Sequence, residues 1–360
     1  MTKAAELAKM GEVLTNSQIG GRRNIVINGA MQVDQRNNGS SINLANGKVF
    51  AVDRFYWIED SSQTPTGQRV TDAPNGFTHS VKITNTSTAT TPSYTQLSHR
   101  IEGNNVSQLY FGNSTAESVT LSFYVKSSLT GQFSASLRNA DSNRSNVSTY
   151  TINSANTWER KTITFVGDTT GTWATDTSVG VELIFRLDDT GGTSSLNQWN
   201  ATGNAFASGS VRFMGNASAT WQITGVQMEI GSVATPFEHR SFGEELALCQ
   251  RYCQARIGSE GSNDTNSQLG YGNARSATAA FFQDRLQVKM RTPPSLTVVN
   301  ANQFYIYQTS AIATTALALD ISDVNTMMLV ATVAGGLTAP TFHTLGANNA
   351  NAQVIYSAEL

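Results

Sequence analysis

Short runs of alternating apolar and polar residues dominate the middle of the chain. Apolar residues hold every second position of Val119–Val125, Phe133–Leu137 and Val179–Leu187. A period of two is typical of β-strands that bury one face. Turn-forming stretches such as Asp141–Asn146 separate the runs, without helical patterns between them. Residues 22–240 are therefore predicted to form an antiparallel β-sandwich.

One strand of this sandwich is predicted to carry a bulge. The apolar alternation from Trp221 to Ile230 changes phase at Gly225. An extra residue in one strand produces such a phase change, and glycine tolerates the backbone angle that a bulge needs.

The apolar period changes from two to about 3.6 after residue 240. Ser241 and Glu244 have the Ser-x-x-Glu spacing of a capping box, in which the two side chains satisfy backbone amides of the first turn. Apolar residues then recur at helical spacing: Leu246, Cys249 and Cys253. Residues 241–256 are therefore predicted to form a helix that links two domains and ends before Gly258.

The two ends of the chain are predicted to form separate parts. Residues 257–360 return to alternation, which predicts a second, smaller β-domain. Residues 1–21 predict a short helix followed by a glycine break, with a narrow apolar stripe formed by Leu7, Met10 and Leu14. So thin a stripe does not stabilise an isolated helix in water, so we expect this helix to dock on another protein.

Composition excludes partners that are attracted by charge alone. The chain has 360 residues, a net charge of −2 and only 14% charged residues, and its basic residues are scattered. No general field therefore attracts nucleic acid or an anionic membrane. No run reaches the roughly 18 apolar residues of a membrane helix, so membrane insertion is not expected.

The residues that could carry catalysis lack a recognisable arrangement. The four histidines lie far apart, and no Gly-x-Ser-x-Gly or P-loop motif occurs. Cys249 and Cys253 have no second ligand pair at zinc spacing, so core packing is favoured over metal binding. We predict no catalytic residue, no metal ligand and no enzyme activity. Structural Ca²⁺ in the acidic turns Asp168–Asp176 or Asp188–Asp189 is an open alternative to an ordinary turn role.

Aromatic side chains are the remaining candidates for a binding site, because sugar faces stack on exposed rings. Trp173 and Trp199 lie in polar, turn-like segments, and Tyr56 lies on the opposite strand face from Phe55 and Trp57. These three residues, Tyr56, Trp173 and Trp199, are predicted as glycan-stacking residues. The alternative is that the tryptophans fill a loop or a subunit interface.

Two segments carry a family resemblance. Asn24–Arg36 (NIVINGAMQVDQR), followed by DRFYW at Asp53–Trp57, resembles the start of the β-sandwich in tailed-bacteriophage tail fibre and virion fibre proteins. The segment Ile223–Cys253 resembles its end. In addition, Ser122–Lys126, Trp158 before Thr162–Phe165, and the closing Gly-Val-Gln-Met-Glu occur in an order similar to that in jelly-roll carbohydrate-binding modules.

The resemblance implies a fold and a function. The expected class is all-β: an antiparallel jelly-roll-like sandwich plus a second smaller β-domain, with a short N-terminal helix and one linking helix. The expected role is a virion structural protein, a tail fibre or fibre/spike component that binds a host cell-surface glycan non-covalently. It would be a homotrimer, attached to other virion proteins through its N-terminal helix. A capsid or tail decoration protein without receptor role is the alternative, and a glycan depolymerase ranks last.

Overall fold

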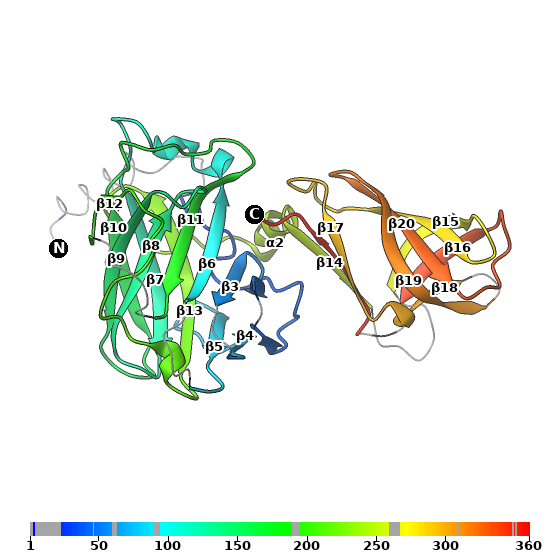
Figure 1. Cartoon of the computed structure of the whole chain (residues 1–360), viewed down its shortest axis with the longest axis horizontal. Helices are drawn as coiled ribbons and strands as arrows, with labels where there is room; N and C mark the ends of the chain where they lie inside the picture. The colour runs from blue at the N-terminus through cyan, green and yellow to red at the C-terminus, as the bar shows by residue number, and fades with distance from the viewer. Residues whose placement is uncertain are drawn as a thin grey trace. The chain divides into compact units, whose positions relative to one another are not determined.

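The computed structural model describes Lys3 and residues 23–45, 47–59, 63–88, 94–188, 195–258, 267–307, 310–347, 349 and 351–360. The chain forms two compact units, the first ending at Glu245 and the second spanning Leu246–Glu359 (Figure 1). The predicted docking residues Leu7, Met10 and Leu14 lie outside the described residues. No helix in the described part of the chain is long and apolar enough to cross a membrane.

Two antiparallel sheets build the first unit, as the alternating pattern predicts. The first sheet has the order β1 (Ile42–Asn43), β4 (Thr66–Val70), β5 (Ser80–Thr84), β13 (Thr220–Ile230), β7 (Val119–Ser127) and β10 (Glu159–Phe165). The second has the order β12 (Trp199–Asn200), β9 (Ser145–Ile152), β8 (Gly131–Arg138), β11 (Val179–Arg186), β6 (Thr95–Glu102), β3 (Phe55–Glu59) and β2 (Val49–Val52). Chain crossings between the sheets, at β5–β6, β6–β7 and β7–β8 among others, give the sandwich its jelly-roll-like character.

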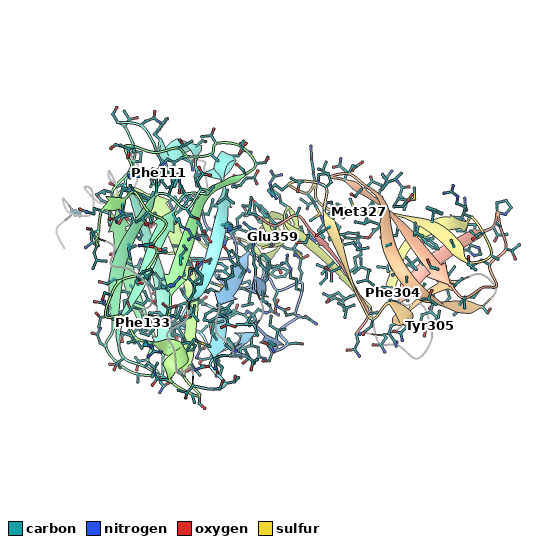
Figure 2. All side chains as sticks on the ribbon, viewed as in Figure 1. Phe111, Phe133, Phe304, Tyr305, Met327 and Glu359 are labelled. Carbon is teal, nitrogen blue, oxygen red and sulfur yellow. The ribbon has the colours of Figure 1, made fainter. Side chains whose placement is uncertain are left out.

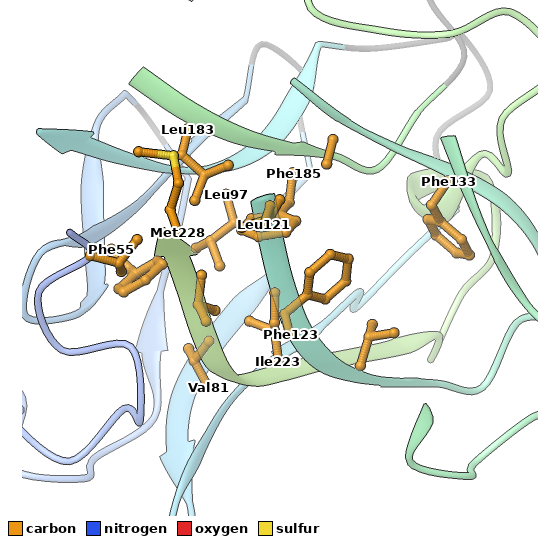
Figure 3. Packing of buried hydrophobic residues seen from close by; sticks show 14 of the residues in the cluster. Phe55, Val81, Leu97, Leu121, Phe123, Phe133, Leu183, Phe185, Ile223 and Met228 are labelled. Atoms are coloured by element: carbon orange, nitrogen blue, oxygen red, sulfur yellow. The ribbon is translucent and has the colours of Figure 1, made fainter. Parts of the chain in front are cut away.

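The inner faces of the two sheets form one apolar core. Alternate residues of β7, and of β11 from Val181 onward, are buried there, because side chains alternate between the two faces of a strand. Figure 3 shows the two sets meeting: Phe55, Leu97, Phe133, Leu183 and Phe185 from the seven-stranded sheet, and Val81, Leu121, Phe123, Ile223 and Met228 from the six-stranded sheet. Burying one such side chain contributes about 1.5–3 kcal/mol, so this core provides the main stabilisation of the sandwich.

The predicted bulge in β13 is confirmed. The pairing of β13 with β7 shifts register between Thr224 and Gln227, and Gly225 has a φ of +62°. A Cβ at Gly225 would lie 2.7 Å from the Phe77 ring, so a side chain here would also clash. Glycine is therefore required both for the backbone angle and for the packing of Phe77.

The linking helix is shorter than predicted. Helix α2 spans Phe242–Gln250, and its N-terminus is capped as predicted, with the Glu244 amide donating to Ser241 Oγ at 3.3 Å. The prediction that residues 251–256 continue the helix is wrong, because Cys253–Ile257 forms strand β14. The backbone groups of β14 pair with β22 (Gln353–Ser357) instead of forming a further helical turn.

The second unit combines a three-stranded sheet with a closed barrel. The sheet has the order β14, β22 and β17 (Ser295–Val299). The barrel has the order β15 (Ser267–Ala274), β16 (Ala279–Arg285), β20 (Thr326–Val333), β19 (Ala311–Ser322), β18 (Phe304–Tyr307) and β21 (Phe342–Ala347). The second unit therefore includes residues that the sequence assigned to the linking helix, such as Cys253 in β14. Its core contains Phe304 and Met327, which Figure 2 labels.

Candidate functional site

A shallow pocket lies among the loops at one end of the sandwich. Figure 2 labels Phe111 at this end and Phe133 at the other. The pocket has a volume of about 210 Å³ and is lined by Val106, which joins the short 3-10 helices η1 (Gly103–Asn105) and η2 (Ser107–Leu109), and by residues of η2, of the loops that follow η2 and β10, and of β11. The lining residues are Val106, Ser107, Tyr110, Phe111, Asn113, Trp173, Ala174, Thr175 and Val181.

The structure brings the two predicted tryptophans together at this pocket. The rings of Trp173 and Trp199 lie 5.2 Å apart at 81°, and Phe111 contacts both edge-to-face, at 4.9 Å and 5.5 Å. Edge-to-face packing is a favourable geometry for aromatic rings. Trp173 lines the pocket, whereas Trp199 packs behind it without lining it. Both rings are half-buried and pack against the sandwich core, which agrees with the alternative that the tryptophans fill a loop.

Internal hydrogen bonds fix the orientation of both indoles. Trp199 Nε1 donates to the Val166 carbonyl at 2.7 Å. Trp173 Nε1 donates to the Thr170 carbonyl and to Asp168 Oδ2, each at 3.3 Å. Both indole N–H groups are therefore already hydrogen-bonded within the protein, and a ligand can contact only the ring carbons. Rings held in this way lose little conformational entropy on binding.

Asp168 is the anchor beneath Trp173. Its buried carboxylate accepts two hydrogen bonds from the Arg144 guanidinium, one of them at 2.8 Å from Nε. The Asp168 carboxylate raises the pKa of Arg144, mainly through this hydrogen bonding. The Gly112 amide also donates to the Asp168 carbonyl at 2.7 Å, which ties the loop after η2 to the loop after β10. Bidentate arginine–carboxylate pairs fix geometry strongly, so this pair positions the pocket wall.

Tyr110 is the residue that the sequence interpretation missed. Its side chain is 54% exposed and lines the pocket, and its backbone is left-handed with a φ of +52°. Such a conformation is costly for a non-glycine residue and persists only where the surroundings impose it. Here Tyr110 ends η2, and its carbonyl accepts hydrogen bonds from the backbone and side chain of Asn113. The only signal in the sequence was the run Leu109-Tyr-Phe-Gly112 between polar residues.

The chemistry of the pocket suits a small neutral ligand. None of its lining residues is charged, and the aromatic residues share the lining with the polar residues Ser107, Asn113 and Thr175. The volume is below the roughly 300–1,000 Å³ of pockets for drug-sized ligands, so it fits one ring or the end of a longer chain. An apolar ring face and several hydrogen-bonding hydroxyls are the matching features of such a ligand.

The prediction for Tyr56 is wrong. Its side chain is 1% exposed, so its ring offers no face for stacking. Its hydroxyl donates to Glu182, and Arg138 Nη2 binds the same carboxylate at 2.7 Å. Burial raises the pKa of the Tyr56 phenol, and the negative charge of Glu182 adds to this effect.

Glu182 is buried, although strand alternation places it on the opposite face from the core residues Val181 and Leu183. Its side chain is 3% exposed. Burial alone would raise the pKa of Glu182, but the charges of Arg138 and Arg100 outweigh it and lower this pKa. The carboxylate thus stays ionised and bonded, which suits an anchor better than a proton donor.

The predicted acidic turns are occupied by protein contacts. Asp168 binds Arg144, and Asp188 accepts from Arg186 Nε at 3.3 Å and from Thr95 Oγ1 at 2.8 Å. Asp189 lies outside the described residues. Among the described residues, no group of three or more His, Cys, Asp or Glu side chains is arranged to hold a metal ion. Both cysteines are buried, as core packing requires.

Comparison with known proteins yields distant likenesses. No family model matches the chain, and no curated protein matches it. Among solved structures, it is similar to the enzymatically active domain of tailspike protein 4 of bacteriophage CBA120, with a TM-score of 0.34 and 14% identity over 58% of this chain and 21% of that chain. The chain thus spans about a fifth of that tailspike structure.

Two carbohydrate-binding modules are also similar to this chain. One is the family 11 module of the Clostridium thermocellum cellulase Lic26A-Cel5E, with a TM-score of 0.28 and 14% identity over 55% of this chain and 99% of that chain. The other is TmCBM61 in complex with β-1,4-galactotriose, with a TM-score of 0.31 and 10% identity over 58% of this chain and 100% of that chain.

Proposed function

We propose that this protein is a non-catalytic glycan-binding component of a bacteriophage fibre or spike. The observation that carries the binding part is the uncharged aromatic pocket formed by Tyr110, Phe111 and Trp173, with Ser107 and Asn113 on its polar side. The Trp173 ring is held by its hydrogen bonds and by Phe111 before a ligand arrives, and Tyr110 is 54% exposed. A sugar would stack on the ring carbons and exchange hydrogen bonds with the hydroxyl and amide groups.

The virion part of the proposal rests on the family resemblance of the two segments that begin and end the sandwich. The segments that carry this resemblance meet in space: Asn24 Nδ2 donates to the Val226 carbonyl at 3.1 Å, and the Ile25 amide to the Met228 carbonyl at 2.9 Å. We further propose a homotrimer in the virion, joined to other virion proteins through residues 1–21. Three copies of a weak site on one fibre would raise the avidity for a surface that displays many glycans.

A binding assay with the full chain tests the glycan part. The chain is applied to an array of bacterial surface polysaccharides, together with Tyr110→Ala and Tyr124→Ala. Tyr124 is a half-buried tyrosine on the outward face of β7, so it is the matched control. We expect binding that Tyr110→Ala weakens and Tyr124→Ala leaves intact. A chain that binds neither the array nor bacterial cells would refute the proposed function.

Electron cryo-microscopy of the intact particle tests the virion part. Density for three copies around one axis on a tail fibre is the expected result. Single copies spread over the capsid would favour the decoration role instead. Release of reducing sugar ends from a bound polysaccharide by the purified chain would contradict the non-catalytic assignment.

A further inference from the structure

Two exposed aromatic rings lie side by side on the outside of the barrel in the second unit. Tyr271 on β15 and Phe342 on β21 have 55% and 65% of their surfaces exposed. Their ring centroids are 5.8 Å apart, and the ring planes differ by only 18°. They are diagonal neighbours, since Tyr271 pairs with Thr344 and Phe342 with Asn273. Large rings exposed together are unusual on a soluble surface and indicate an interaction site.

The backbone beneath Tyr271 is built for close approach. Tyr271 lies between Gly270 and Gly272, and a Cβ at Gly272 would lie 1.6 Å from the Phe281 carbonyl oxygen. A Cβ at Gly270 would lie 2.6 Å from the Gln283 carbonyl oxygen. Only glycine therefore permits β15 to approach β16 as it does. This contact holds Tyr271 on the outer surface of the barrel.

The position of the Tyr271 ring is also fixed. Its hydroxyl donates to Gln268 Oε1 at 2.7 Å, and the stack with Phe342 limits rotation of the ring. A ring restrained at its hydroxyl and on one face presents a prepared surface, which lowers the entropy cost of binding.

The side chains directly beside the two rings are polar and uncharged, and the nearest charges on this face are those of exposed Arg285, two positions after Gln283, and of Arg275, which lies 5.1 Å from the Phe281 ring. Asn273 and Gln283 are exposed, and Thr344 is half-buried next to Tyr271. The nearest acidic neighbour in the same strands, Asp284, points to the inside, where it binds Arg256 and Tyr356. The surface therefore offers apolar ring faces beside amide donors and acceptors. Ring faces for stacking beside amides for hydrogen bonding match a neutral sugar ring.

We propose that Tyr271 and Phe342, with Asn273 and Gln283, form a second binding surface, for neutral carbohydrate, on the barrel. The sugar would lie against the exposed ring faces and exchange hydrogen bonds with the two amides. This surface lies in a different unit from the pocket at Tyr110 and does not depend on that pocket. With two surfaces per chain, one glycan-coated cell could be held at more than one point of each fibre.

The distribution of tryptophan makes the two surfaces separately measurable. All five tryptophans lie at or before position 221, so the barrel contains none. Binding at the pocket places a ligand on Trp173 and changes tryptophan fluorescence. Binding at the barrel gives a calorimetric signal without this change.

The experiment titrates the full chain with neutral oligosaccharides of glucose, galactose and N-acetylglucosamine, by calorimetry and by tryptophan fluorescence. Tyr271→Ala and Phe342→Ala are compared with Ile321→Ala, an exposed aliphatic residue on the same barrel (64% exposed), and with Tyr110→Ala. We expect the fluorescence-silent binding to weaken roughly fivefold or more in Tyr271→Ala and Phe342→Ala. Ile321→Ala and Tyr110→Ala should retain it.

Three results would overturn the second surface. The first is fluorescence-silent binding that is equal in Tyr271→Ala, Phe342→Ala and the unaltered chain. The second is a loss of oligomer in sedimentation with either ring variant, which would show that the rings contact a second copy of the chain. The third is a titration in which every oligosaccharide that binds also changes the tryptophan fluorescence. The proposed function is tested separately, and it fails if the chain binds neither the polysaccharide array nor bacterial cells.

Discussion

The indole of Trp173 stands nearly perpendicular to that of Trp199, at 81° with 5.2 Å between the ring centroids. Trp199 pairs with Asn146 at the edge of the seven-stranded sheet, so the contact joins a loop to the sandwich. Through this contact the pocket wall is supported by the core. The two tryptophans therefore have different roles, one as a binding wall and one as its support.

This relationship predicts that both tryptophan variants lose stability. Trp173→Ala and Trp199→Ala remove half-buried rings that also pack on Phe111, so we expect each to cost about 2 kcal/mol of unfolding free energy. Tyr110→Ala should cost less than about 0.5 kcal/mol, because its ring is largely exposed. Urea denaturation of the three variants measures this. An equal loss of unfolding free energy in all three variants would contradict the distinction between the supporting tryptophans and the binding residue Tyr110.

The anchor of the pocket gives a second prediction. Asp168→Asn replaces a carboxylate that binds Arg144 by two hydrogen bonds and also accepts the Trp173 indole N–H. Breaking a largely buried pair leaves an arginine without its counter-charge, so we expect a loss of about 2–4 kcal/mol. Glycan affinity should fall as well, because Trp173 loses its orientation. Asp176→Asn is the control, since Asp176 lies in the same loop and its carboxylate contacts Ser178 at the surface. A stable Asp168→Asn chain with unchanged affinity would contradict the anchoring role.

The burial of Tyr56 predicts a variant that affects stability without affecting binding. Tyr56→Phe removes the hydroxyl that donates to the buried Glu182 carboxylate. Loss of one hydrogen bond to a buried charge costs about 1–3 kcal/mol. Array binding should be unchanged, because the ring is inaccessible. Weakened glycan binding at unchanged melting temperature would restore Tyr56 as a contact residue.

His99 predicts a loss of stability on mild acidification. Burial holds the pKa of His99 well below its usual value of 6.5, and the charge of Arg54 lowers it further. The unfolded chain binds a proton near pH 6.5 while the folded chain does not, so stability is full above this pH and falls below it. One such group changes the unfolding free energy by up to about 1.4 kcal/mol per pH unit.

Denaturation at pH 7, 6 and 5 measures the contribution of His99. In His99→Gln the decline between pH 7 and 5 should be smaller than in the unaltered chain. His79→Gln should change it less, because His79 is half-buried and its pKa is lowered by burial and by Arg69 to a smaller extent. An unaltered chain that is equally stable at pH 7 and 5 would contradict the assignment.

Local patterns predicted the elements of the fold more fully than the site. Alternation in β7, β8 and β11, the phase change at Gly225 and the Ser241 cap each follow from neighbouring residues, and all three are confirmed. The end of α2 was missed because pairing of Cys253–Ile257 with β22, about 100 residues later in the chain, overrides helical spacing. The closed barrel was missed for the same reason, since its closure depends on the pairing of β15 with β21.

The site depends still more on contacts between distant segments. Trp173 and Trp199 stood out because their segments are polar, but nothing in the sequence shows that Phe111 joins them or that Arg144 binds Asp168. Tyr56 alternates away from Phe55 and Trp57 as predicted, yet it is buried. On this outer face the Tyr56 ring is covered by its neighbours, since the Phe50 ring lies 5.7 Å from it and Lys48 Nζ lies 4.3 Å from its centroid. Alternation identifies the face of a strand but not what covers that face.

The most direct test of the account is the affinity of Tyr110→Ala for the oligosaccharide that the array selects. Calorimetry on the unaltered chain, Tyr110→Ala and Tyr124→Ala gives three dissociation constants, and melting temperatures confirm that the variants are folded. The account predicts roughly tenfold weaker binding for Tyr110→Ala alone, with a melting temperature close to that of the unaltered chain. Equal affinity in all three proteins, with a tryptophan fluorescence change that persists in Tyr110→Ala, would contradict it.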